Sequence, residues 1–227
     1  MKEHRSIHSG FTVLELLVVV SVLGLLSGLL GPGLARAASS ARGVNCLGNL
    51  RNWGQATHAY ATDNADLLPL DGAGNGHSTR SAWYADLPPQ LGQRPYHEQG
   101  GWRTNPVPPL PRNVWLCPAN ERRSDGRMLF HYTLNRLVNG SGDDARQIPL
   151  GSVLEPARTV WLFDNGKKAA VAQAGNVHRT VHRNGANFLF LDGHAARFGD
   201  DAYWDVIRNR PFTDHPALRW SGRDELR

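Results

Sequence analysis

The sequence lacks the patterns that would identify an enzyme. It has no serine-hydrolase elbow, no P-loop and no glycine-rich dinucleotide-binding turn. It also lacks clustered charge, because 25 Lys and Arg interleave with 20 Asp and Glu without a run of five like charges. Nucleic acid binds basic patches, which such a mixed surface does not offer. We therefore expect no catalytic residues, no cofactor and no nucleic-acid partner.

Large apolar side chains are scarce outside one segment. Leu, Ile, Val and Phe number 53 of 227 residues, and 15 of them lie between Phe11 and Leu34. That segment carries one charge, Glu15, and is long enough to span a bilayer as a helix. The 193 residues from Ala35 onward hold only 37 such side chains, so their core must draw on the seven Trp and on other support.

The apolar segment has two interpretations. A short basic stretch precedes it, and Ala35-Arg36-Ala37 is similar to the cleavage site of a secretory signal. A signal core, however, runs to only about 7 to 15 apolar residues. A carboxylate within lipid costs about 2.5 to 3.5 kcal/mol, so retention of Glu15 indicates a partner cation. Both points favour an anchored helix over a secretory signal.

The start of the apolar segment carries a family resemblance. Residues 10–15, Gly-Phe-Thr-Val-Leu-Glu, resemble the processing site of bacterial type IV prepilins and type II secretion pseudopilins. The resemblance implies that a prepilin peptidase and methyltransferase cleaves after Gly10 and methylates Phe11. It also implies that Glu15 pairs with the terminal amine of a neighbouring subunit during assembly.

This resemblance implies a location and a set of partners. The chain would be a single-pass protein of the inner membrane, with its head in the periplasm or outside the cell. Its partners would be the peptidase, membrane lipid and other subunits of a type IV pilus or a type II secretion-like filament. The alternative is a secreted or membrane-tethered binding module, in which the apolar segment serves only for export.

A helical pattern continues beyond the apolar segment. Gly31-Pro32-Gly33 predicts a kink or local melting of the helix. Asx residues before Pro69 predict that the helix ends near Asp63, although Asp63, Asn64 and Asp66 could instead bind Ca²⁺. Between these points, intervals of three and four define one apolar stripe, formed by Cys46, Leu50, Trp53, Thr57 and Tyr60.

The rest of the sequence predicts an α+β fold, with the long helix packed on a small antiparallel β-sheet head. Nine Pro and six Gly between Pro69 and Pro118 indicate a surface excursion. Its aromatic residues, Trp83, Tyr84, Tyr96 and Trp102, are expected to pack inward. Strand-like runs follow at 113–117, 128–134, 159–163, 187–191 and 194–198.

Six segments result from these boundaries. They are a leader at 1–10, a membrane and assembly helix at 11–33, an amphipathic half-helix at 34–63, the excursion at 64–112, the head at 113–200 and a tail at 201–227.

The last pair of strand-like runs carries a second motif. Asp192-Gly193 joins the two runs, and a two-residue Asp-Gly link predicts a hairpin in which both turn residues have positive φ. Nine residues separate His182 from Asp192, and the pattern resembles the H-x9-DG signature of a subset of prepilin-like proteins. We expect His182 to form a hydrogen bond across the base of this hairpin.

Two further groups of residues have alternative interpretations. Cys46 and Cys117 could form a disulfide between helix and sheet that contributes roughly 4 kcal/mol, or remain as two buried thiols. A zinc ion could bind near the hairpin, but no closely spaced histidine pair supports this, and we predict no metal site. The zinc ligands considered are His178, His182, Asp192 and His194.

Overall fold

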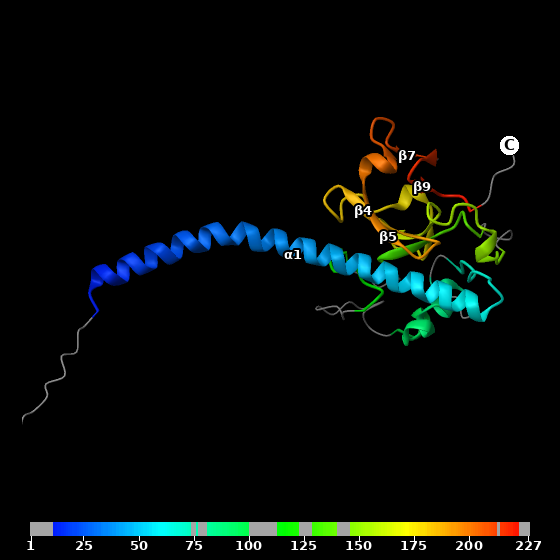
Figure 1. Cartoon of the computed structure of the whole chain (residues 1–227), viewed down its shortest axis with the longest axis horizontal. Coiled ribbons are helices and arrows are strands. Elements are labelled where there is room, and N and C mark those ends of the chain that lie inside the picture. The colour runs from blue at the N-terminus through cyan, green and yellow to red at the C-terminus, as the bar shows by residue number, and fades with distance from the viewer. Residues whose placement is uncertain are drawn as a thin grey trace, which may run out of the picture. The chain divides into compact units, whose positions relative to one another are not determined.

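The computed structural model describes residues 11–73, 76, 81–99, 113–122, 129–139, 146–212 and 214–222. Its chain forms two compact units, Met1–Ala41 and Arg42–Arg227. The first unit contains the beginning of one long helix, α1 (Val13–Asp63), and the second is an α+β head built on the remainder of that helix (Figure 1).

In the first unit, α1 is continuous and its apolar side chains are exposed. The backbone stays helical through residues 31–33, so the predicted local melting is wrong. Pro32 removes one N–H donor, but the helical turns on either side supply enough hydrogen bonds to continue the helix. The exposed fractions are 83% for Val13 and 71% for Leu25.

In the second unit, α1 packs through the predicted stripe, which is confirmed. All five stripe residues are buried, and Ala56 and Ala61 extend the buried surface. The helix ends at Asp63, as the Asx-rich sequence predicts. The head therefore forms on about the last six turns of this helix, from Arg42 to Asp63.

A five-stranded sheet lies against this part of α1. Its strands occur in the order β3-β1-β2-β4-β5. Their bounds are β1 (Tyr132–Asn135), β2 (Val160–Asp164), β3 (Val171–Ala172), β4 (Gly185–Phe190) and β5 (Ala195–Gly199).

The prediction of an antiparallel sheet is wrong in one respect. β1 pairs in parallel with β3, and all other neighbours are antiparallel. Both edges of β2 are occupied, by β1 and by β4, and the chain after β2 goes past the start of β1 and adds β3 at its far edge. The sheet is therefore mixed.

The strand predicted at 113–117 is also wrong. Asn113 Oδ1 accepts a hydrogen bond from the N–H of Trp115, and Asn113 O accepts one from Leu116, so this segment forms a turn. The other four strands exist with shifted ends; β1, for example, begins only at Tyr132, and Met128 lies outside the described residues.

Each face of the sheet supports a separate core. A register shift in β2 between Val160 and Leu162 lets Trp161 and Leu162 both join the core on the α1 side. Val160 and Phe163 join the core on the opposite face. That second core, which we call the outer core, also contains Phe188, Phe190, Tyr203, Trp204, Leu218 and Trp220.

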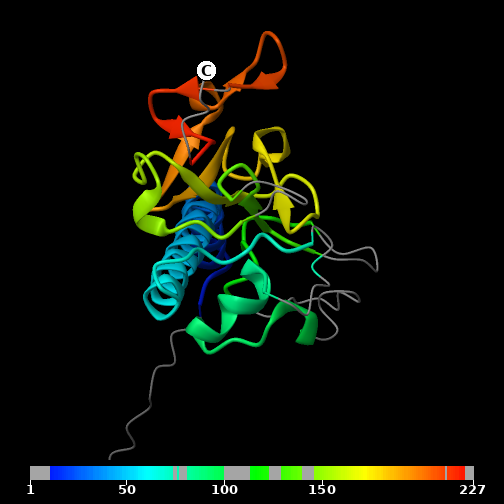
Figure 2. The same ribbon diagram turned by 90° about the vertical axis from the view of Figure 1, so that its right-hand side faces the viewer.

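The outer core depends on residues predicted to form a tail. After the 3-10 helix η6 (Asp200–Ala202), two short hairpins cover this face of the sheet, opposite α1 (Figure 2). Their strands are β6 (Trp204–Asp205), β7 (Arg210–Pro211), β8 (Asp214–His215) and β9 (Leu218–Arg219). The C-terminal residues through Gly222 are thus part of the head, because the sheet has two apolar faces to cover.

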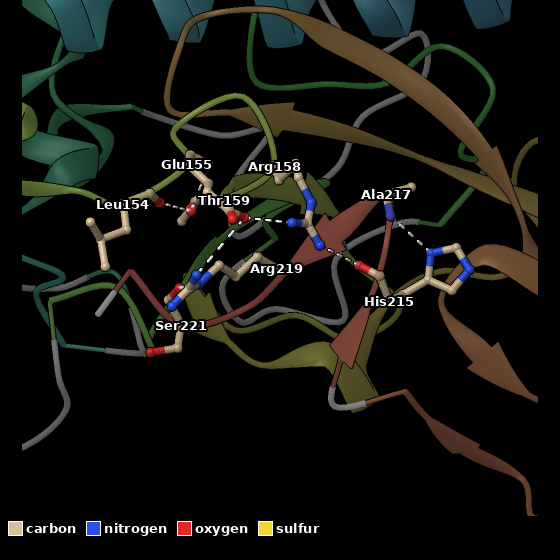
Figure 3. Close-up of polar contacts among 8 residues, drawn as sticks. All are labelled: Leu154, Glu155, Arg158, Thr159, His215, Ala217, Arg219 and Ser221. Carbon is tan, nitrogen blue, oxygen red and sulfur yellow. Dashed lines mark hydrogen bonds and ion pairs between the residues drawn. The ribbon is translucent and has the colours of Figure 1, made fainter. Parts of the chain in front are cut away.

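Polar contacts attach the second hairpin to the loop before β2 (Figure 3). Arg158 donates to His215 O at 3.0 Å and forms an ion pair with Glu155 Oε2 at 2.5 Å. The N–H of Arg219 donates to Arg158 O at 2.7 Å. These bonds hold the hairpin where Leu218 and Trp220 can enter the outer core.

The excursion contains short helices: α2 (Trp83–Asp86) and the 3-10 helices η1 (Pro88–Leu91) and η2 (Tyr96–Glu98). Further 3-10 turns are η4 (Leu150–Ser152) and η5 (Ala174–Asn176). Trp83, Tyr84 and Tyr96 are buried as predicted, whereas Trp102 lies outside the described residues. Trp83 meets Trp53 of α1 edge to face, with ring centroids 5.5 Å apart, which packs the excursion onto the helix.

Candidate assembly helix and helix–sheet joint

The start of α1 is a capping box. The N–H and the hydroxyl of Thr12 both donate to Glu15 Oε2 at 2.8 Å, and the N–H of Glu15 donates to Thr12 Oγ1 at 3.3 Å. The helix therefore begins at Val13 because Thr12 and Glu15 satisfy each other's backbone donors. Glu15 therefore has a structural role within its own chain, in addition to the partner cation that its retention in the apolar segment indicates.

The residues around the predicted cleavage site are only partly described. Gly10 lies outside the described residues. Phe11 is not helical, and its side chain is exposed. Two residues, Phe11 and Thr12, thus separate the predicted cleavage point from the first helical residue.

Among the described residues, α1 is the one helix that is long and apolar enough to cross a membrane. None of its most apolar stretch is buried. A core helix of a soluble protein and a signal sequence can be equally long and apolar. The described part of the chain does not cover these side chains, so α1 is a candidate membrane span.

Cys46 and Cys117 form a disulfide in the structure. Their Cα atoms are 4.8 Å apart, and 71 residues separate them in the sequence. Cys46 belongs to the buried stripe of α1, and Cys117 follows the turn at 113–116. The bond therefore links the helix to the segment that follows the excursion.

His182 lies beside this disulfide and not at the base of the hairpin. Its Nε2 is 3.1 Å from Asp164 Oδ2 and 3.5 Å from Cys117 Sγ. The prediction of a hydrogen bond across the hairpin base is wrong. The loop before β4 places His182 next to Gly43 of α1, where its partner is Asp164 of β2. His182 and Asp164 are both buried, so the contact satisfies His182 Nε2 and Asp164 Oδ2.

The Asp192-Gly193 end of the motif contacts α1 at a different place. The loop has three residues, 191–193, and only Gly193 has positive φ, at 90°. Phe190 O accepts from the N–H of Gly193 at 2.9 Å, which indicates a turn followed by a left-handed glycine in place of the predicted two-residue turn. Gly193 packs directly against Gly54 of α1.

The nine-residue spacing of the motif has a physical explanation. His182 reaches α1 at Gly43 and Gly193 reaches it at Gly54, a separation of about 16 Å along the helix. The six residues of β4 between them span about 20 Å. The nine residues of the H-x9-DG pattern thus contain one strand that lies along the helix. The residues on either side of this strand contact the helix.

The considered zinc ligands do not come together as a set. His194 Nδ1 is 2.6 Å from Asp192 Oδ1 on the exposed hairpin loop, whereas His182 bonds to Asp164. Burial and the nearby Arg122 guanidinium lower the pKa of His178, although the Asp164 carboxylate opposes this effect. The group with metal-ligand geometry is instead Cys46, Cys117 and His182, which sequence spacing alone could not assemble.

Asx residues after α1 bond to backbone groups. Asn64 Nδ2 donates to Tyr60 O at 2.8 Å, and Asp66 Oδ2 accepts from the N–H of Gly151 at 2.8 Å. Each bond closes or anchors the turn that ends the helix. These contacts favour the helix-ending interpretation over the Ca²⁺ alternative.

Asp71 is a buried acid that the sequence analysis did not single out. Asn139 Nδ2 donates to its Oδ1 at 3.0 Å, and burial raises the pKa of this carboxyl to about 7. A single Asp between Leu70 and Gly72 carries no sequence signal of burial.

Comparison of the chain with models of known protein families, with curated proteins and with solved structures finds no match. The prepilin resemblance therefore rests on the two motifs and the helix pattern of this sequence.

Proposed function

We propose that the chain is a prepilin-like or pseudopilin-like subunit. It is cleaved after Gly10, methylated on Phe11, anchored in the inner membrane by α1, and assembled through α1 into a type IV pilus or a type II secretion-like filament. The observation that carries the proposal is the exposed apolar surface of α1 from Val13 to Leu26, on a helix that continues into a folded head. Lipid before assembly and neighbouring helices after it would cover this surface.

The head supports a structural role over a catalytic one. His182 and Asp164 satisfy each other in the core, and Asp192 and Gly193 shape a loop that packs on the helix. The H-x9-DG motif thus serves to hold β4 on α1. We infer that the protein is not an enzyme and that its partners are the prepilin peptidase and methyltransferase, lipid and other subunits.

Mass spectrometry of the mature N-terminus tests the processing step. The full-length chain, expressed with a prepilin peptidase, should begin at Phe11 and carry one additional methyl group. A catalytically inactive peptidase is the control, and should leave residues 1–10 in place. A mature chain that begins at Ala38 would contradict the proposal and favour the exported binding module.

A pair of substitutions separates the two roles of Glu15. Glu15→Gln keeps an acceptor for the Thr12 donors, because Gln also forms a capping box, but removes the charge. Thr12→Val removes the capping hydroxyl and keeps the charge. If Glu15 pairs with the terminal amine of a neighbour, Glu15→Gln should abolish filament assembly in cells while Thr12→Val reduces it only slightly. If the two variants assemble filaments equally well, the role of Glu15 is confined to the capping box.

A further inference from the structure

We propose that the newly made chain, in which Cys46 and Cys117 are still thiols, binds one zinc ion through Cys46, Cys117 and His182, with Asp164 as the fourth donor. Oxidation to the disulfide then replaces the ion. The site is independent of the filament function proposed above. It differs from the zinc set considered near the hairpin, with which it shares only His182.

The ligand atoms lie close together, and one pair, Cys117 Sγ and His182 Nε2, already has the required separation. The candidate ligand atoms of Cys46, Cys117 and His182 all lie within 4.8 Å of one another. Zn–S bonds of about 2.3 Å and Zn–N bonds of about 2.0 to 2.1 Å in a tetrahedral site place S and N about 3.5 Å apart. His182 Nε2 is 3.5 Å from Cys117 Sγ. Breaking the S–S bond permits the two sulfur atoms to separate from 2.09 Å to about 3.8 Å. Cys46 Sγ must at the same time move closer to His182, because the longest distance within the group is 4.8 Å.

Asp164 completes the donor set. Its Oδ2 is 3.1 Å from His182 Nε2, close to the roughly 3.4 Å between N and O ligands of a tetrahedral zinc ion. The N–H of Asn187 donates to the same Oδ2 at 2.7 Å and fixes the carboxylate. In the described part of the chain, Asp164 Oδ1 is buried and has no hydrogen-bond partner. A cation beside this carboxylate would compensate its burial.

The four donors come from separate parts of the head. Cys46 lies on α1, Cys117 follows the excursion, Asp164 ends β2, and His182 lies in the loop before β4. All four side chains are buried. An ion at this point would join α1 to the sheet before oxidation, as the disulfide does afterwards.

The exchange of ion for disulfide is chemically balanced. Zinc binding converts two thiols to thiolates and releases two protons. Oxidation removes two electrons from the sulfur atoms and forms one S–S bond, and a disulfide of an oxidising partner accepts these electrons with two protons from water and becomes a dithiol. The zinc ion leaves because the S–S bond removes both thiolate ligands.

Cobalt titration of the full-length chain in detergent tests the site. The disulfide is first reduced without oxygen by a water-soluble phosphine, which takes one oxygen atom from water, becomes the phosphine oxide and leaves two thiols. Co²⁺ should then bind at one equivalent, with thiolate-to-cobalt charge-transfer bands and the visible bands of a tetrahedral ion, and Zn²⁺ should displace it. The oxidised chain should bind none.

Matched histidine substitutions assign the ligands. His182→Asn should weaken Co²⁺ binding more than about 100-fold, since even partners outside the ligand shell contribute 10- to 100-fold. His194→Asn, on the exposed hairpin loop, should leave binding unchanged. Equal binding by the two variants would overturn the proposal.

A measurement on the unsubstituted chain covers the case in which His182→Asn does not fold. X-ray absorption at the zinc edge of the reduced, zinc-loaded chain should give two sulfur neighbours and two nitrogen or oxygen neighbours. A shell without sulfur, or no stoichiometric binding by the reduced chain, would also overturn the proposal.

Discussion

A methyl group added at Gly54 tests the contact between α1 and the hairpin loop. An ideal Cβ at Gly54 would lie 2.9 Å from Leu189 Cδ1, 3.0 Å from Gly193 O and 3.2 Å from Gly193 Cα. Two of these atoms belong to backbone and cannot move without displacing the loop. At Gly48, on the same helix, an added Cβ would meet no atom within 4 Å.

The two positions form a matched pair. Gly→Ala within a helix stabilises by about 0.8 to 1 kcal/mol at either site. Gly54→Ala also adds an overpacking cost of about 1 to 3 kcal/mol, so the free energies of unfolding of the two variants should differ by that cost. A domain of this size changes Tm by roughly 2 to 4 °C per kcal/mol, which predicts a Tm for Gly54→Ala about 2 to 12 °C below that of Gly48→Ala.

Thermal unfolding of the full-length variants, followed by tryptophan fluorescence in detergent, measures this difference. The unsubstituted chain provides the reference for the gain in helix propensity. If Gly54→Ala is as stable as Gly48→Ala, the loop does not contact the helix, and our explanation of the motif spacing is wrong.

Two other predictions concern buried polar groups. Thr57→Val should lower the free energy of unfolding by about 1 to 3 kcal/mol, because the buried Trp161 Nε1–H donates to Thr57 Oγ1 at 3.0 Å, whereas Thr62→Val on the exposed face should have little effect. An acid whose pKa rises on folding stabilises the folded state least at high pH, so stability should fall between about pH 4 and the folded pKa of about 7 for Asp71. Asp71→Asn should remove this loss of stability, which amounts to roughly 4 kcal/mol, whereas Asp63→Asn should not. Denaturant unfolding at a series of pH values measures the stability of both variants and of the unsubstituted chain. If the three profiles of stability against pH coincide, the prediction is wrong.

Periodicity was sufficient to predict the helix but not the sheet. The stripe from Cys46 to Tyr60 repeats at helical intervals, and all of its residues are buried. The parallel pairing of β1 with β3 depends instead on which strand edges are still free after β2 and β4 pair, and no local pattern records that. The segment at 113–117 has strand composition, but one Asn side chain that bonds to the backbone makes it a turn.

In the candidate site, too, the sequence predicted contacts between residues that are close in the chain better than contacts between distant ones. The sequence identified His182, Asp192 and Gly193 as a motif but assigned His182 the wrong partner. Its partner, Asp164, lies on β2 and approaches only because β2 and β4 are neighbours. The Thr12–Glu15 capping box was present in the sequence as T-x-x-E and could have been predicted from it.

The placement of β4 between two contacts on α1 restricts how the length of this segment can change. Residues alternate between the two faces of a strand, so removal of one residue from β4 would turn Leu189 toward the outer core and Phe188 toward the helix. Removal of two would restore the faces but shorten the strand by about 7 Å, too much for His182 and Gly193 to keep both contacts. An insertion or deletion here must therefore be compensated outside the strand, either at Arg183 and Asn184 before it, both of which have positive φ, or at Leu191 and Asp192 after it.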